Sequence, residues 1–128
     1  MLVSEGLALR NVVHVNALLA SITDFAAFNH IYATMFATAP PSRACVAVNL
    51  APPCRLVLEC YAYEDSSPQA RFSLHVQGIS YWAPANIGPY SQAIHVSLPR
   101  YKYQSQRDVF LRLTTFHSYL DKLALFLT

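Results

Sequence analysis

The sequence predicts an α+β fold in which one amphipathic helix packs on a small β-sheet. Three features indicate this class. A run rich in β-branched residues over 12–20 predicts a strand that is buried on both faces. Apolar residues at helical spacing over 24–36 predict the helix, and alternating apolar residues over 43–50 and 55–63 predict two further strands.

The composition supports a folded chain of at most one ordinary domain. It has 128 residues, of which 54% are hydrophobic, and this excludes a disordered chain. The net charge of +2 is small and scattered, so we expect neither a nucleic-acid partner nor a membrane surface. The start lacks the basic region of a signal peptide, and no run reaches the ~18 apolar residues of a spanning helix. We therefore expect a cytoplasmic protein.

The cysteines are Cys45, Cys54 and Cys60, an odd number without a paired CxxC spacing. This pattern is typical of reduced thiols in a cytosolic protein. A zinc site that combines them with His30 or His75 matches no ligand spacing of known sites, so we predict no metal. The simpler interpretation is that the cysteines are small hydrophobic core residues.

The elements of the first half follow in order. Residues 2–10 are typical of the end of a helix, and the first strand begins at Val12. Thr23 is a suitable N-cap for the next helix, 24–36, with Asp24 in its first turn. The helix stripe, which we interpret as core packing against the sheet, consists of Phe25, Phe28, Ile31, Tyr32, Met35 and Phe36. Two prolines at 40–41 end the helix.

The two alternating segments that follow are joined by a short turn at 51–54, and we interpret them as a β-hairpin. Period-two alternation predicts that Arg43 and Cys45 share a face of the first strand. We expect Glu59 of the second strand to lie on this same polar face, away from the buried face that carries Leu56.

The second half divides into a boundary, a loop region and a tail. The polar, turn-rich stretch 64–69 marks a domain boundary, 72–80 is strand-like, and 81–90 is a loop punctuated by Pro and Gly. From residue 107 onward, apolar residues step by four and three, which predicts a helix that packs into an apolar groove. Its stripe consists of Val109, Leu113, Phe116, Leu120, Leu123 and Leu127.

Three motifs in this order resemble the second half of the Rid (reactive intermediate deaminase) family fold. They are Thr-Asp-Phe-Ala-Ala-Phe-Asn at 23–29, Pro-Ser-Arg-Ala-Cys-Val at 41–46 and Leu-Glu-Cys-Tyr-Ala at 58–62. The segment 83–93, which contains Gly-Pro-Tyr-Ser-Gln, resembles the opening of the same fold. The connector 74–84 is similar to that between the tandem Rid domains of long diphthine–ammonia ligases.

The resemblance implies an incomplete Rid-like domain. Residues 1–64 would form its C-terminal half, with a strand-helix-hairpin core, and 65–71 a linker. Residues 72–96 would form the connector and the opening segment of a second Rid-like domain, and 97–128 an unrelated tail that ends in the C-terminal helix. A start inside one domain and an unrelated tail inside the next indicate a truncated or alternatively spliced form.

The resemblance also implies a function. The chain would be an accessory region of a diphthine–ammonia ligase, which amidates diphthine on elongation factor two at the expense of ATP. With three glycines and no glycine-rich phosphate loop, the chain is expected to bind no cofactor itself and to be inactive alone as a ligase. Self-association through Rid-like surfaces is a further expectation. A free-standing Rid-type imine deaminase or small-ligand module is the alternative, and a non-functional splice product stays open.

The candidate site residues follow from the same motifs. The Arg43 guanidinium presents paired donors that match a carboxylate, and in Rid enzymes the equivalent arginine binds an imino acid. Glu59 would act as general base, Cys45 and Asn29 would contact the ligand, and Tyr90 would line the pocket. A cross-strand ion pair between Arg43 and Glu59, with Cys45 in the core, is the structural alternative.

Overall fold

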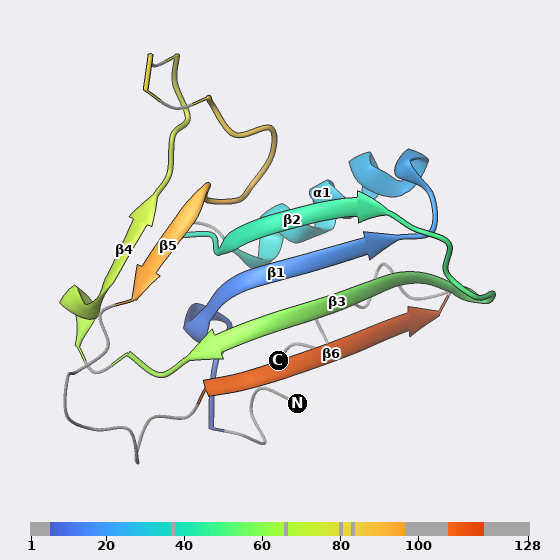
Figure 1. Cartoon of the computed structure of the whole chain (residues 1–128), viewed down its shortest axis with the longest axis horizontal. Helices are drawn as coiled ribbons and strands as arrows, with labels where there is room; N and C mark the ends of the chain where they lie inside the picture. Colours follow the sequence, from blue (N-terminus) through green and yellow to red (C-terminus); the bar gives the residue numbers. More distant parts are fainter. Residues whose placement is uncertain are drawn as a thin grey trace.

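The computed structural model describes residues 6–36, 38–65, 67–79, 81–82 and 84–96, and the backbone of 108–116. These residues form a four-stranded sheet in the order β2-β1-β3-β6, with the helix α1 behind it in Figure 1, and a separate two-stranded ribbon, β4–β5. The α+β prediction is therefore confirmed. The elements are β1 (Val12–Leu19), α1 (Phe25–Met35), β2 (Ser42–Ala47), β3 (Cys54–Tyr63), β4 (Arg71–Leu74), β5 (Ala93–Val96) and β6 (Asp108–Phe116), with short 3-10 turns at Leu9–Asn11, Ile22–Asp24 and Pro68–Ala70.

The predicted hairpin is wrong, although both of its strands exist. The strand β1 lies between them, pairing in parallel with β2 and antiparallel with β3. Alternation identifies a strand but not its neighbour, and β1 takes the central position between the two. One face of β1 is buried and the other only half-buried, so the predicted burial on both faces is wrong. The end of β1 is held from both sides, since Val48 N donates to Leu19 O at 2.8 Å and Ala20 N donates to Arg55 O at 2.9 Å.

The strand register decides which residues share a face. Val15 of β1 lies opposite both Arg43 and Cys60, whereas Asn16 lies opposite Glu59. Residues directly opposite each other point to the same side of a sheet, and successive residues alternate. Arg43 therefore points to the side of Cys60, and Glu59 points to the other side.

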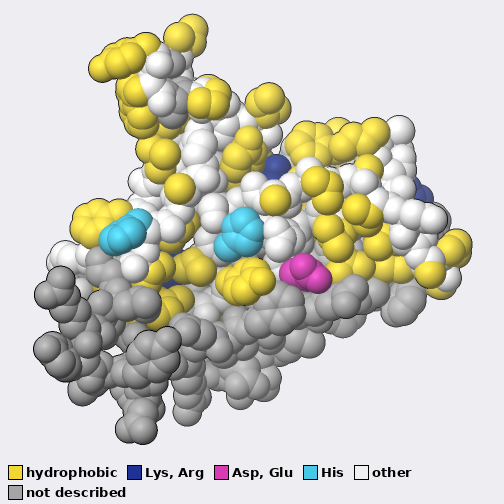
Figure 2. Space-filling model, in the orientation of Figure 1, with side chains coloured by type: hydrophobic (Ala, Val, Ile, Leu, Met, Phe, Trp, Pro, Cys, Tyr) yellow, Lys and Arg dark blue, Asp and Glu magenta, His cyan; other side chains and the backbone are white. Residues whose placement is uncertain are grey.

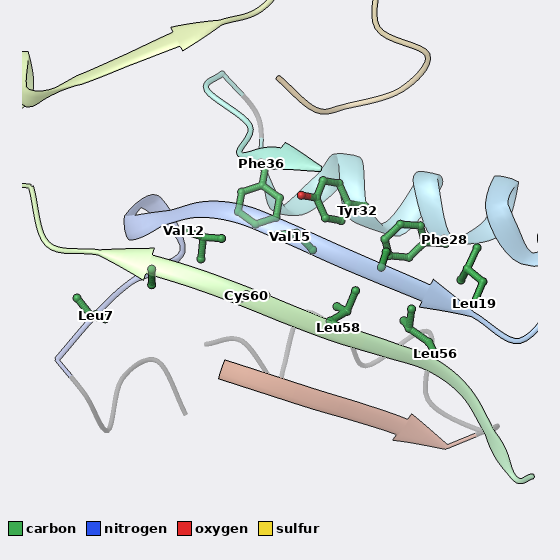
Figure 3. Packing of buried hydrophobic residues seen from close by; sticks show 12 residues of the cluster. Leu7, Val12, Val15, Leu19, Phe28, Tyr32, Phe36, Leu56, Leu58 and Cys60 are labelled. Carbon is green, nitrogen blue, oxygen red and sulfur yellow. The ribbon is translucent and has the colours of Figure 1, made fainter. Parts of the chain in front are cut away.

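This register overturns the predicted common face of Arg43, Cys45 and Glu59. Arg43 and Cys45 do share a face, but Leu56 belongs to that face as well, because it lies opposite Leu19 of β1. This face of the sheet is the one that α1 covers (Figure 3). Glu59 lies on the opposite face, so the alternative ion pair between Arg43 and Glu59 is also wrong.

The core lies between α1 and the sheet (Figure 3). The rings of Phe28 and Tyr32 pack in a tilted arrangement with a centroid distance of 5.3 Å. Tyr32 and Phe36 pack in the same way at 4.9 Å. These rings meet apolar residues of β1 and β3. The buried cluster consists of Leu7, Val12, Val15, Ala17, Leu19, Phe28, Tyr32, Phe36, Leu56, Leu58, Cys60 and Ala62. The predicted aromatic stripe of the helix is therefore confirmed as core packing.

The beginning of α1 differs in detail from the prediction. Ser21, rather than Thr23, caps the preceding 3-10 turn, since its Oγ accepts a hydrogen bond from the Thr23 N–H at 3.3 Å. Asp24 forms an ion pair with Arg55 of β3. Residues 6–8 are not helical and 9–11 form a 3-10 turn, so the predicted helix end before β1 is wrong over the described residues.

The tail supplies a strand where a helix was predicted. Asp108–Phe116 pairs antiparallel with β3, with Leu113 opposite Leu58. The rest of the predicted helix lies outside the described residues. Valine, threonine and phenylalanine in this segment favour a strand, and the edge of β3 presents backbone groups that need partners. Over this segment the tail therefore pairs with β3 as a strand, and the predicted helix in an apolar groove is wrong.

The ribbon stands apart from the main sheet in Figure 1. Its strand β4 covers four residues and is shorter than predicted. It pairs antiparallel with β5, with Arg71 opposite Val96 and Leu74 opposite Ala93. The segment before β5 returns to the main sheet, where Ser91 forms a parallel bridge with Ser42 at the start of β2. Over the described residues, no helix is long and apolar enough to cross a membrane.

Candidate functional site

The Arg43 side chain lies in an aromatic cage beneath α1. Its guanidinium carbon is 4.7 Å from the ring centre of Tyr32, 5.0 Å from Tyr90, 5.3 Å from Phe28 and 5.8 Å from Phe25. Ring faces attract a cation most strongly where water is scarce. Burial lowers the pKa of Arg43, partly offset by Tyr32 and Cys45. A guanidinium nevertheless stays charged at neutral pH.

Buried polar atoms without partners gather at this cage. Among the described residues, Arg43 Nη1, Asn29 Oδ1 and Tyr32 Oη are buried and have no hydrogen-bond partner. Burial raises the pKa of Tyr32 far above its usual value, so the phenol is neutral. Unsatisfied buried donors and acceptors cost ~1–3 kcal/mol each, and most proteins avoid them outside functional sites.

A cavity of about 300 Å³ opens next to the guanidinium and is lined by Phe25, Arg43, Cys45, Ile87 and Tyr90. This volume is at the lower end of the range for small-molecule sites. Cys45, a free thiol, has a pKa raised by burial, although the nearby Arg43 lowers it. The thiol is therefore neutral near pH 7 and suits contact with a ligand better than nucleophilic attack.

The segment that precedes β5 forms one wall of this cavity. Gly88 has φ of +125°, and a Cβ at this position would lie 3.1 Å from Arg43 Nη2 and 3.3 Å from Asn29 Nδ2. Both the backbone conformation and the close approach favour glycine. The Asn86 side chain donates to Gly88 O at 2.9 Å and to Tyr90 O at 2.6 Å, which shapes the turn that presents the Tyr90 ring.

Ser91 fastens this wall to the main sheet. Its side chain is fully buried, and its Oγ donates to Pro40 O at 2.6 Å. Its N–H donates to Pro41 O at 3.1 Å, next to the bridge with Ser42. Because Tyr90 precedes Ser91 directly, these bonds hold the tyrosine ring over Arg43.

The structure brings together most of the predicted site residues. Arg43, Cys45 and Tyr90 line one cavity, and the Asn29 side chain lies beside it, next to the Gly88 backbone. Glu59 lies on the opposite face of the sheet. Figure 2 shows that face, on which hydrophobic side chains predominate and acidic and histidine side chains lie among them.

Several residues of the cage were not predicted as site residues. Phe25, Phe28 and Tyr32 were predicted only as core, and Gly88 and Ile87 were predicted only as loop. The sequence does place Phe25, Phe28 and Tyr32 on one helix face together with Asn29, because of their helical spacing. No local signal in the sequence indicates that this face covers Arg43.

Comparison with known proteins shows the family to which the sequence is similar. Residues 1–64 match the family described as Endoribonuclease L-PSP. The chain is 48% identical to the diphthine–ammonia ligase of Schizosaccharomyces pombe over 95 residues, which cover 73% of this chain and 15% of the ligase. It is 33% identical to the diphthine–ammonia ligase of Saccharomyces cerevisiae over 101 residues, with 70% of this chain and 15% of the ligase covered.

Shorter similarities extend to smaller proteins. Protein HMF1 of Saccharomyces cerevisiae is 46% identical over 52 residues, which cover 41% of this chain and 40% of that protein. A solved structure of an endoribonuclease L-PSP from Entamoeba histolytica is 40% identical, with a TM-score of 0.43, and covers 46% of this chain and 48% of that chain. The chain spans about 15% of the length of the two ligases that it matches.

Proposed function

Because this chain belongs to the endoribonuclease L-PSP (Rid) family, we propose that it binds a small carboxylate ligand at Arg43, as an accessory region of a diphthine–ammonia ligase. The family match covers Arg43 and the three cage rings of residues 25–32, but not Tyr90. The similarity to two ligases motivates the second part of the proposal. ATP binding and the amidation of diphthine on elongation factor two would belong to the ligase as a whole.

The observation that carries this proposal is the buried Arg43 guanidinium nitrogen without a hydrogen-bond partner. Its Nη1 is buried without a partner, and neither of the ion pairs found among the described residues involves it. The ring faces around it stabilise the positive charge, but a ring face does not satisfy the N–H donors in the plane of the guanidinium. A carboxylate would accept two parallel hydrogen bonds from such a fork.

Asn29 narrows the ligand class further. Its buried Oδ1 lacks a donor, so the ligand should carry an N–H group beside its carboxylate. A cavity of about 300 Å³ suits a molecule of amino-acid or imino-acid size. These three features together favour an amino or imino acid over a simple carboxylate.

The deaminase alternative lacks support from the position of its predicted base. Glu59 lies across the sheet from Arg43, and the described residues that line the cavity include neither a carboxylate nor an imidazole. The geometry of the described chain therefore favours binding over turnover. Self-association through Rid-like surfaces stays a prediction, which the mass of the purified chain in solution tests.

Calorimetric titration with three matched probes tests the proposal. L-alanine carries both groups, pyruvate carries only the carboxylate, and L-alaninamide carries only the amine. We expect alanine to bind most tightly, pyruvate more weakly and alaninamide not measurably. Arg43→Lys should weaken the binding of alanine by about tenfold because it removes the paired donors, and Arg55→Ala should not change it. Equal binding of alaninamide and alanine would refute a carboxylate site.

A further inference from the structure

Arg71, at the start of β4, makes contacts with three separate parts of the chain. Its side chain pairs with Asp65 of the linker, at 2.9 Å from Nη2 and 3.2 Å from Nε. It also donates to backbone carbonyl groups at the start of β1 and the end of β3. These acceptors are Arg10 O at 2.6 Å, Asn11 O at 3.3 Å, Val12 O at 3.4 Å and Tyr63 O at 3.5 Å.

These contacts lie beside a cavity at this end of the ribbon. This cavity has a volume of about 680 Å³. Its lining includes Ser73 and Ile94 of the ribbon, and Arg10 and Glu64, which lie next to the ends of β1 and β3 in the main sheet. The Arg71 side chain is only 17% exposed, so its hydrogen bonds are better shielded from water than those of a surface arginine. The attachment is therefore polar and centres on one guanidinium.

The ribbon connects Arg71 to the wall of the Arg43 site. At the far end of β4, Leu74 O accepts a hydrogen bond from Gln92 N at 2.9 Å. The next residue, His75, places Nδ1 3.1 Å from Tyr90 O. The Gln92 side chain adds two bonds to the Val76 backbone, at 3.0 and 3.1 Å. The position of Tyr90 thus depends on where β4 lies.

We infer that Arg71 is a positioning residue for the Arg43 site: it fixes the ribbon to the main domain and thereby holds the Tyr90 wall over the guanidinium. This inference rests on the proposed function for its effect on ligand binding. Its structural part, the placement of residues 90–92, is independent of any ligand. Among the described residues, Arg71 attaches the ribbon to the main sheet at one end and Ser91 at the other. Loss of the Arg71 contacts should weaken the hydrogen bonds of Ser91.

Hydrogen exchange tests the structural part directly. The amides of Tyr90, Ser91 and Gln92 donate to Gly88 O, Pro41 O and Leu74 O. In Arg71→Ala we expect these amides to exchange about tenfold faster or more. The variant loses the hydrogen bonds of the guanidinium, so the ribbon should open more often. The control is Arg55→Ala, which removes the other arginine–aspartate pair and should leave the three amides unchanged. Unchanged exchange in Arg71→Ala would overturn the inference.

Ligand affinity tests the link to the site. We expect Arg71→Ala to weaken the binding of L-alanine by about tenfold and to have no further effect when Tyr90 is already changed to Ala. Additive losses in the double variant would show that Arg71 does not act through Tyr90. Faster exchange in α1 would show that Arg71→Ala loosens the whole fold. The milder variant Arg71→Lys is then used, and we expect the same changes in exchange and affinity, but smaller. If the unchanged chain binds no alanine, the proposed function fails, and the exchange data still decide the positioning role.

Discussion

The guanidinium carbon of Arg43 lies 5.0 Å from the ring centre of Tyr90, although β2 carries the first residue and the segment before β5 carries the second. This contact joins the main sheet and the ribbon at one cavity. It depends on a close approach of the backbone to Arg43 at Gly88, which belongs to the turn that presents Tyr90.

Gly88→Ala should therefore damage the site without unfolding the sheet. The new Cβ would lie 3.1 Å from Arg43 Nη2, in a backbone conformation with φ of +125°. We expect the wall to shift and the affinity for L-alanine to fall by about tenfold, with a small change in melting temperature. Gly78→Ala is the matched control, since a Cβ there meets nothing within 4 Å. Equal affinities in both variants would contradict this account.

Asn29→Asp should supply Arg43 with an internal partner. A carboxylate at this position lies next to the guanidinium, because both side chains approach the same point at Gly88. We expect a gain of about 1–2 kcal/mol in the free energy of unfolding and the loss of alanine binding, since the new carboxylate competes with the ligand. Asn49→Asp, on an exposed position after β2, adds the same charge as a control. A site that still binds alanine after Asn29→Asp would argue against Arg43 as the anchor.

Cys60 should make the protein sensitive to alkaline pH. Burial raises the pKa of its thiol from 9.0 to about 11, because the thiolate is disfavoured in the core. The folded state thus favours the protonated thiol, and this contribution is complete below pH 9 and lost as the pH rises from 9 to about 11. Two pKa units correspond to about 3 kcal/mol. Chemical denaturation between pH 8 and 11 should show a smaller decline in Cys60→Ala than in the unchanged chain, and equal declines would assign the effect to other groups.

Hydrogen exchange should also distinguish the strand β6 from the helix that its sequence pattern predicts. An edge strand donates alternate amides to its neighbour and leaves the others to solvent. A helix protects consecutive amides. We expect protection to alternate along 108–116, with β3 as the partner. A continuous block of protected amides over this segment would contradict the strand.

The sequence was sufficient to predict β1, α1, β2 and β3 and which residues of β2 share a face, but not the strand β6. The pair Arg43 and Cys45 follows from local alternation alone, and the aromatic stripe of α1 follows from local helical spacing. The side of Glu59 could not be predicted in this way, because it depends on the register of β1 between the two strands. The segment 108–116 satisfies helical spacing and strand propensity alike, so only the open edge of β3 decides between them.

The proximity of Tyr90 to Arg43 is the part of the site that no local pattern predicts. It arises from the hydrogen bonds of Ser91 to the prolines before β2 and from the attachment of the ribbon through Arg71. Contacts of this kind between distant segments leave no period in the sequence. Only the position of Tyr90 in the pocket was expected, from the likeness of 83–93 to the opening of the Rid fold.

Nuclear magnetic resonance of the arginine side chains tests the central claim, a carboxylate site at Arg43, most directly. With nitrogen-15 label in the guanidinium groups, the Arg43 signals should shift on addition of L-alanine and stay unchanged on addition of L-alaninamide. The signals of Arg55 and Arg71, which already have carboxylate partners, should stay in place in both titrations. An unchanged Arg43 signal at saturating alanine, or an equal shift with alaninamide, would contradict the account.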